Sequence, residues 1–144
     1  MASRALVGVA ARSLADVDEI TLPQFRALVF VSSRERTTVS DLATALGVHS
    51  TSATRLCDRL VRKRLLRRSE AADDRRQTDL HLTVAGRRLV ERVTERRRRD
   101  LGAIAERMGA EAAGAAIAAL EAFSAAADGR PGEADLFGWN PAER

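Results

Sequence analysis

The segment Ser50–Lys63 limits the fold of this chain more than any other stretch of its sequence. If the segment is a helix, residues three and four positions apart share a face. One face is then apolar and consists of Ala53, Leu56, Cys57 and Leu60. The other face carries hydroxyl and guanidinium groups from Thr51, Arg55 and Arg62, with Asp58 among them and with Ser52, Thr54 and Arg59 at its edges. Such a helix packs one side on a core and offers the other side to a partner or to solvent.

The residues before this helix predict a helix-turn-helix. Thr38 and Asp41 have the spacing of a capping box, which satisfies backbone N–H groups at the start of a helix. They open a short helix that runs to Leu46, and Gly47 suits the left-handed position that ends many helices. A short helix, a glycine-containing turn and an amphipathic second helix form a helix-turn-helix. We expect Val48 to fill the angle between the two helices.

Four further helices and one hairpin are expected around this unit. The helices are expected at about 3–16, 22–33, 84–108 and 111–127. Pro23 and Gln24 mark the start of the second helix, and Thr83 caps the long one. Two short segments, 65–69 and 79–82, flank a polar stretch and are predicted to form a wing, which is a hairpin with a charged tip.

Composition agrees with a mainly α fold and narrows the function. Aromatic residues make up 3% of the chain and Tyr is absent, so the core must be built from Ala, Leu and Val. The net charge of +4 and the sequence pI of about 10.7 favour a polyanionic partner. One Cys and two distant His residues cannot form an internal disulfide or a four-ligand zinc site. No nucleophile–base pair or phosphate loop is visible, so we expect neither an enzyme nor a cofactor.

Localisation and assembly are also predicted. The N-terminus is too short and too charged for a secretory signal, and no apolar run is long enough to span a membrane. We therefore expect a cytoplasmic protein with no membrane partner. The first, long and last helices carry more apolar surface than one winged unit can cover. This excess predicts a homodimer that buries more than ~2,000 Å² in total.

From about Thr21 to Leu101 the chain resembles the MarR family of bacterial winged helix-turn-helix regulators. The resemblance is densest in TLPQFRALV, TRLCDRLVRKRLLRR and DDRRQTDLHLTVAGRRL. The last is the most specific, because it joins an Asp-Arg-Arg wing tip to Leu-x-Leu-Thr-x-x-Gly. The resemblance implies a mainly α fold with a winged helix-turn-helix, a two-stranded wing and dimerisation helices at both termini. We divide the chain into a dimerisation helix (1–20), a DNA-binding part (21–83), the long and last dimerisation helices (84–128) and a tail (129–144).

The resemblance also implies which residues bind DNA. In the recognition helix it implies base or phosphate contacts from Ser50, Thr51, Ser52, Thr54, Arg55 and Arg59. In the wing it implies a minor-groove contact from Arg76, braced by Asp74, with Arg75 as a further DNA-binding residue of the tip. The implied function is that of a homodimeric repressor of nearby genes. It would bind a pseudo-palindromic double-stranded operator and be released by a small-molecule effector.

Two other functions fit the same residues. An architectural protein would bind DNA with little sequence preference, and it differs from a repressor in its specificity ratio rather than its affinity. A winged helix that binds only proteins is disfavoured by Arg55, Arg59 and Arg76, since such a surface need not be cationic.

Several residues carry their own expectations. Arg64 stands where the family has Gly after the recognition helix. Either the turn differs there, or a cost of about 1 kcal/mol is accepted for another phosphate contact. Cys57 is expected to fill the core, with an oxidant sensor as the alternative. Arg96–Arg99 is expected to be solvated, with a phosphate-binding or dimer-bridging patch as the alternative. The apolar Leu136–Trp139 lies outside the family pattern and either docks on the dimer or stays unpacked.

Overall fold

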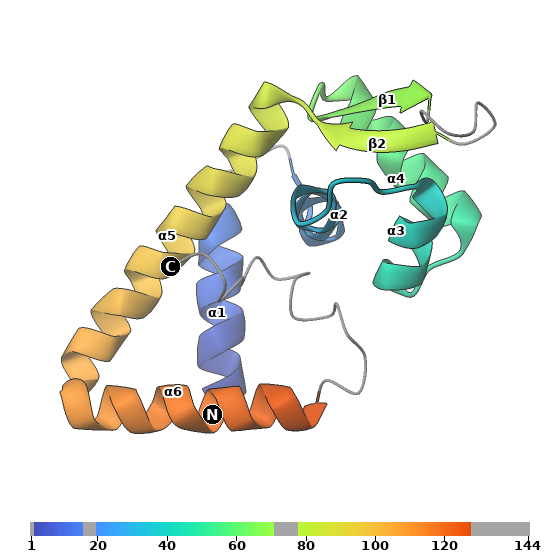
Figure 1. The fold of residues 1–144 in the computed structure, drawn as a ribbon. Coiled ribbons are helices and arrows are strands. Elements are labelled where there is room, and N and C mark those ends of the chain that lie inside the picture. Colours follow the sequence, from blue (N-terminus) through green and yellow to red (C-terminus); the bar gives the residue numbers. More distant parts are fainter. Residues whose placement is uncertain (1, 16–19, 71–77, 128–144) are drawn as a thin grey trace.

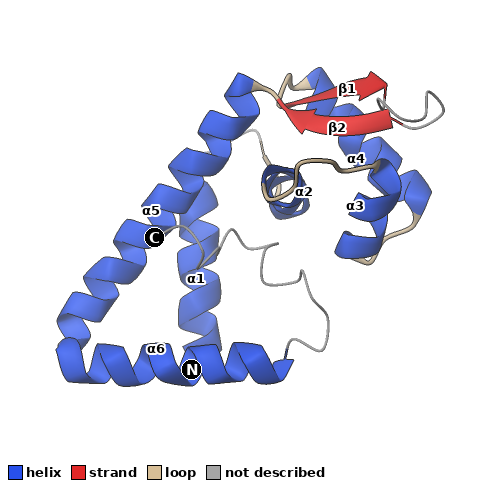
Figure 2. Ribbon diagram, viewed as in Figure 1, coloured by secondary structure: helices blue, strands red, loops and turns tan. Residues whose placement is uncertain are grey.

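The computed structural model describes residues 2–15, 20–70 and 78–127. The helices are α1 (Ala2–Ala15), α2 (Leu22–Ser32), α3 (Val39–Leu46), α4 (Ser50–Arg62), α5 (Val84–Met108) and α6 (Ala110–Ala127). Between α4 and α5, strands β1 (Leu66–Glu70) and β2 (Thr78–Leu82) form one antiparallel sheet (Figure 2). The expected mainly α winged helix-turn-helix is therefore confirmed, with element bounds within a few residues of those predicted.

The helix starts are capped as the sequence predicted. The backbone N–H of Thr21 donates to Gln24 Oε1 at 3.3 Å, just before α2. At α3, Thr38 Oγ1 accepts from the Asp41 N–H at 3.2 Å, and Asp41 Oδ2 accepts from the Thr38 N–H at 2.8 Å. Gly47 ends α3 with a φ of 64°, in the left-handed region. These caps fix where α2 and α3 begin and how the chain turns toward α4.

One prediction about this turn is wrong. Val48 does not fill the angle between α3 and α4, because its side chain is 41% exposed. Its backbone N–H donates to Ala43 O at 3.0 Å, so Val48 helps to cap the C-terminus of α3 through its main chain. Leu42 of α3 and Ala53 of α4 are fully buried instead.

The main core lies beneath the sheet and between α2, α3 and α4. Buried side chains from these elements and from the start of α5 form one continuous cluster, which includes Leu28, Leu42, Leu60, Leu80 and Leu89. The whole predicted apolar face of α4 is buried, and Leu56, Cys57 and Leu60 belong to this cluster. Because this face is held in the core, the opposite face of α4 must point away from it.

The sheet is tied directly to the helix-turn-helix. Leu66 pairs with Leu82 and Glu70 with Thr78, which sets the register of the hairpin. The Leu80 N–H donates to Thr37 O at 2.7 Å, and Thr38 forms an isolated antiparallel bridge with Asp79, so the residues just before α3 are joined to β2. The wing is thus anchored at its base on the same backbone that starts α3.

A second, smaller core lies where α1, α2 and α5 meet. A second buried cluster of Phe25, Val29 and Val93 joins α2 to α5, with Leu14 of α1 against it. After Gly109 the chain turns sharply, and α6 lies at the far end of α5 from the wing (Figure 1). No helix within the described ranges is long and apolar enough to cross a membrane.

The arginine run on α5 is less solvated than expected. Arg98 and Arg99 are exposed, but Arg96 and Arg97 are partly buried. The guanidinium carbon of Arg97 lies 5.9 Å from the centre of the Phe25 ring, and burial lowers the Arg97 pKa. The prediction of a solvated run therefore holds for two of its four residues, while Arg97 packs between α2 and α5.

Candidate nucleic-acid interface

The outer face of α4 gathers the predicted DNA-binding residues of the recognition helix. All six are exposed: Ser50, Thr51, Ser52, Thr54, Arg55 and Arg59. Among the described residues, the Arg55 and Arg59 guanidinium groups have no ion pair or hydrogen bond. Both therefore have their donors available to an external acceptor, and a guanidinium fork suits a guanine edge or a phosphate.

Thr54 is less available than the sequence suggested. Its hydroxyl donates to Ser50 O, four residues earlier, at 2.8 Å. A Thr hydroxyl has one hydrogen to donate, so in this state Thr54 can only accept further bonds. A phosphate oxygen also only accepts, so Thr54 would have to break its bond to Ser50 before it could bind one.

The N-terminus of α4 has features that sequence analysis missed. His49 is the N-cap residue, but its side chain makes no capping hydrogen bond, and the first turn contains no acidic residue. The first N–H groups of any α-helix have no acceptor within the helix, so those of Ser50 and Thr51 stay available. An anion placed there would meet these donors, the hydroxyls and the positive end of the helix dipole. The sequence does contain a signal for this. His49 stands at the N-cap position of α4, where α3 and α5 have the capping residues Thr38 and Thr83.

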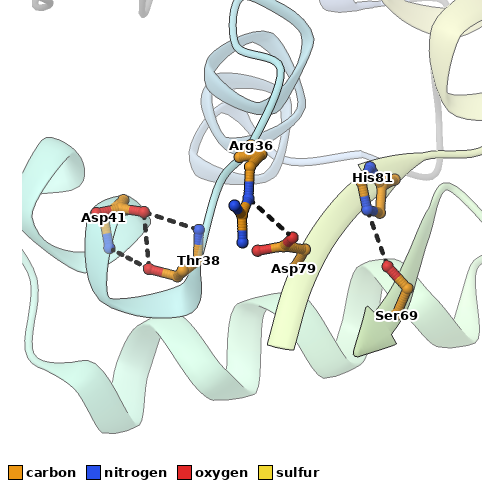
Figure 3. A network of polar contacts seen from close by, with 6 residues as sticks. All are labelled: Arg36, Thr38, Asp41, Ser69, Asp79 and His81. Carbon is orange, nitrogen blue, oxygen red and sulfur yellow. Dashed lines mark hydrogen bonds and ion pairs between the residues drawn. The ribbon is translucent and has the colours of Figure 1, made fainter. Parts of the chain in front are cut away.

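The strands of the wing are held against the helix-turn-helix by two ion pairs. Arg68 Nη1 on β1 lies 2.9 Å from Asp58 Oδ1 on α4. Arg36 Nε, in the loop before α3, lies 3.3 Å from Asp79 Oδ2 on β2 (Figure 3). Asp58 was predicted only to share the outer face of α4, and its partner on β1 was missed. The pairs fix the position of the wing base relative to the recognition helix.

The outer surface of the sheet carries a hydrogen bond between its two strands. His81 Nε2 on β2 and Ser69 Oγ on β1 lie 2.9 Å apart, a hydrogen bond across the two strands (Figure 3). This contact gives His81 a structural role between the two strands. The predicted wing-tip residues Asp74, Arg75 and Arg76 lie outside the described residues, as does the Leu136–Trp139 segment.

The turn after α4 resolves the question raised by Arg64. Arg64 has a φ of 57°, so the turn keeps the left-handed conformation that favours Gly. Thr83 Oγ1 donates to Arg64 O at 2.7 Å, and the Thr83 N–H donates to Leu65 O at 3.1 Å. A Cβ at Gly86 would lie 2.1 Å from Leu65 O. The Leu-x-Leu-Thr-x-x-Gly motif thus joins the end of the recognition helix to the start of α5.

Cys57 behaves as a core residue. It is fully buried in the main core, and burial raises the pKa of its thiol, with Arg68 opposing that shift. A protonated, enclosed thiol is a poor nucleophile. The prediction that Cys57 fills the core is confirmed.

A shallow hollow of about 510 Å³ lies between α1 and α5. Its lining is mostly charged and consists of Ser13, Glu91, Arg92, Val93, Glu95, Arg96 and Arg99. Across residues 2–15, 20–70 and 78–127, no group of three or more His, Cys, Asp and Glu side chains could hold a metal ion.

Comparisons with known proteins identify the relatives of this architecture. A family model described as the MarR family matches residues 19–77. The solved structure of RV1404 from Mycobacterium tuberculosis is 41% identical, with 90% of each chain covered and a TM-score of 0.81. A mutant of S. aureus MepR bound to an oligodeoxyribonucleotide is 25% identical, covers 89% of this chain and 94% of that chain, and has a TM-score of 0.68. S. aureus MepR bound to ethidium bromide is 25% identical, with 89% and 92% covered and a TM-score of 0.68. Among curated proteins, none matches the sequence.

Proposed function

The chain belongs to the MarR family of transcriptional regulators, and we propose that it is a homodimeric repressor that binds a pseudo-palindromic operator near the genes it controls. The observation that carries this proposal is the outer face of α4. That face combines a helix N-terminus without a side-chain cap, exposed hydroxyls, and the cations of Arg55 and Arg59, which form no ion pair with any described residue. A relative of 25% identity, S. aureus MepR, is bound to an oligodeoxyribonucleotide. We place this activity in the cytoplasm, with double-stranded DNA as the partner.

We assign separate roles to the residues of α4. Ser50, Thr51 and Ser52 lie at the helix start, where hydroxyl and N–H donors would fix the helix on phosphates. Arg55 lies in the second turn and is proposed to donate to the O6/N7 edge of a guanine. Arg59, one turn further along, would bind a phosphate, and Thr54 would support the helix through its bond to Ser50.

The wing would supply the second contact to each half-site. β1 ends at Glu70 and β2 begins at Thr78, and two ion pairs connect the base of the wing to the helix-turn-helix. We propose that Arg76 enters a narrow minor groove there, with Asp74 as its brace and Arg75 on an adjoining phosphate. A narrow minor groove attracts arginine because its negative potential is strong.

We propose that the dimer forms through α1, α5 and α6. Large apolar side chains on these helices are exposed in the single chain, including Val7 (67%), Leu120 (47%) and Phe123 (71%). A face of this kind normally marks an interface. The proposed division of the chain into dimerisation helices and a DNA-binding part follows from this separation of apolar and cationic surfaces.

Light scattering at micromolar concentration tests the dimer. Leu120→Glu places a charge on the exposed apolar stripe of α6 and should give monomers. Ala122→Glu places the same charge two residues away, on the opposite side of the helix, and should leave the dimer intact. A wild-type protein that is monomeric would contradict the proposal.

A competition titration at one salt concentration tests sequence-specific recognition. Arg55→Ala should lose about 1–3 kcal/mol of discrimination per half-site, because a bidentate arginine–guanine pair is worth that much. Its affinity for random duplex should stay close to that of the wild type. Arg98→Ala removes the same charge from the solvent side of α5 and should change neither affinity. Equal losses for operator and random duplex in Arg55→Ala would favour the architectural alternative.

We further propose that a small-molecule effector releases the protein from DNA. The hollow between α1 and α5 supports it, and S. aureus MepR, a relative, is bound to ethidium bromide. The lining combines three arginines and two glutamates with apolar surface, so benzoate, which has a carboxylate and an apolar ring, is a suitable first probe. It should weaken operator binding by the wild type and have less effect on Arg92→Gln. Equal effects on both proteins would show that the effector does not act through this hollow.

A further inference from the structure

The turn that ends the recognition helix holds an arginine in a backbone conformation that L-residues rarely adopt. Among the described residues, Arg64 is the one non-glycine residue with a positive φ, at 57°. The other two such positions, Gly47 and Gly109, are glycines. A side chain in the left-handed region destabilises the fold, because its Cβ approaches the backbone. Residues kept in such conformations often serve a function.

The turn cannot avoid this conformation by relaxing. Thr83 binds the carbonyl oxygens of both Arg64 and Leu65 through its side chain and its backbone N–H. Gly86 approaches Leu65 so closely that no Cβ would fit between them. The backbone around position 64 is therefore fixed by α5, whatever residue stands there. Glycine would fit at this position without the cost, so the arginine side chain needs its own explanation.

The side chain of Arg64 is exposed and cationic, in strongly basic surroundings. The stretch 59–68 contains six basic residues and no acidic one. Two of them have partners on the protein, since Arg68 pairs with Asp58 and Lys63 Nζ donates to Gln24 Oε1 at 3.1 Å. For Arg64, in the part of the chain that the structure describes, neither an ion pair nor a side-chain hydrogen bond exists. Its charge is therefore available to a partner outside the chain.

The length of α4 indicates what that partner is. The helix has 13 residues, and at ~1.5 Å per residue it is about 20 Å long. The major groove is only ~12 Å wide. If the first two turns of α4 lie among the bases, its C-terminal end extends to the phosphates that border the groove.

We propose that Arg64 binds a phosphate at the border of the major groove, and that the strained turn is retained for this contact. Arg62, on the same outer face of α4 as Arg55, adds to the positive potential there. This inference rests on the proposed function, because it requires that α4 enter the groove. The proposed contact comes from the turn just after α4. It adds affinity for the phosphate backbone but carries no sequence information.

Three variants separate the side chain from the backbone strain. Arg64→Gly should raise the unfolding midpoint by about 2–4 °C, because it removes the strain. It should also lower the slope of log K against log salt by about 0.9 for each lost phosphate contact, and thus by about 2 for a dimer. Arg64→Lys keeps the charge and should keep most of the slope. Arg98→Gln, which removes an equal charge from the solvent side of α5, should leave both quantities unchanged.

The contact itself is located with methylphosphonate-substituted duplexes, in which single phosphates are neutral. A substitution at the groove border should weaken the wild type and have no further effect on Arg64→Gly. Operator and random duplex should lose the same factor in that variant. If Arg64→Gly keeps the wild-type slope, or its midpoint does not rise, the inference is wrong. If instead the wild type shows no preference for any duplex, it is the proposed function that fails.

Discussion

Gly86→Ala is a substitution for which two physical effects predict opposite signs. Gly86 lies in the first turns of α5, where alanine is preferred over glycine by about 1 kcal/mol. A Cβ at this position, however, would lie 2.1 Å from Leu65 O and 3.3 Å from Leu82 Cδ2. Helix propensity alone predicts a more stable protein, and the contact with Leu65 predicts a less stable one.

The magnitudes decide which effect is larger. Carbon and oxygen atoms in contact lie at least about 3.3 Å apart, so the turn and the helix must separate by about 1 Å. Overpacking of this kind costs about 1–3 kcal/mol. The separation also weakens the Thr83 N–H bond to Leu65 O, which contributes about 0.5–1.5 kcal/mol. After the gain in helix propensity, Gly86→Ala should lower the free energy of unfolding by roughly 1–3 kcal/mol.

Gly102 provides the matched control, because it lies in the same helix and a Cβ there would meet no atom within 4 Å. Gly102→Ala should raise the free energy of unfolding by up to about 1 kcal/mol. Urea unfolding, followed by far-UV circular dichroism at one protein concentration, measures both variants. If Gly86→Ala is as stable as Gly102→Ala, the close approach of α5 to the turn after α4 does not exist.

Two more predictions concern the helix-turn-helix and the wing. Burial raises the pKa of the Cys57 thiol above its ordinary value of 9.0. The unfolded chain therefore loses this proton first, and stability should fall as pH rises above 9.0. In urea titrations, the free energy of unfolding of Cys57→Ala should fall less steeply at alkaline pH than that of the wild type. If both fall equally, groups other than Cys57 cause the decline. The Asp58–Arg68 pair is partly exposed, so a double-mutant cycle with Asp58→Asn and Arg68→Gln should give a coupling of at most about 1 kcal/mol. A larger value would mean that the pair is shielded from solvent.

The parts of the fold that sequence predicted well are those decided by neighbouring residues. Caps at Thr21, Thr38 and Thr83 place three helix starts, because a capping residue and its partner lie within three positions. The apolar face of α4 follows from helical spacing alone. The hairpin was inferred mainly from its position after a helix-turn-helix, because the strand signal of its two short segments is weak, and its register agrees with those segments.

The parts that sequence did not predict depend on how distant elements cross. Asp58 pairs with Arg68 because β1 passes over α4, and no local pattern encodes that crossing. Arg97 is half-buried because α2 brings Phe25 against α5. For Arg64, the sequence left two conformations open, and the choice came from Thr83 and Gly86, about twenty residues later. The prediction for Val48 was wrong because an apolar residue in a tight turn can contribute a backbone hydrogen bond while its side chain stays exposed.

The central claim is that two α4 helices of one dimer read a two-fold symmetric operator. Hydroxyl-radical footprinting tests it most directly, on duplexes that the wild-type protein has selected from a random pool. We expect the selected duplexes to converge on one sequence. We also expect two symmetric protected regions, whose centres lie about 10 bp apart on one face of the duplex. Uniform protection without a convergent sequence would contradict it and identify the protein as an architectural DNA binder.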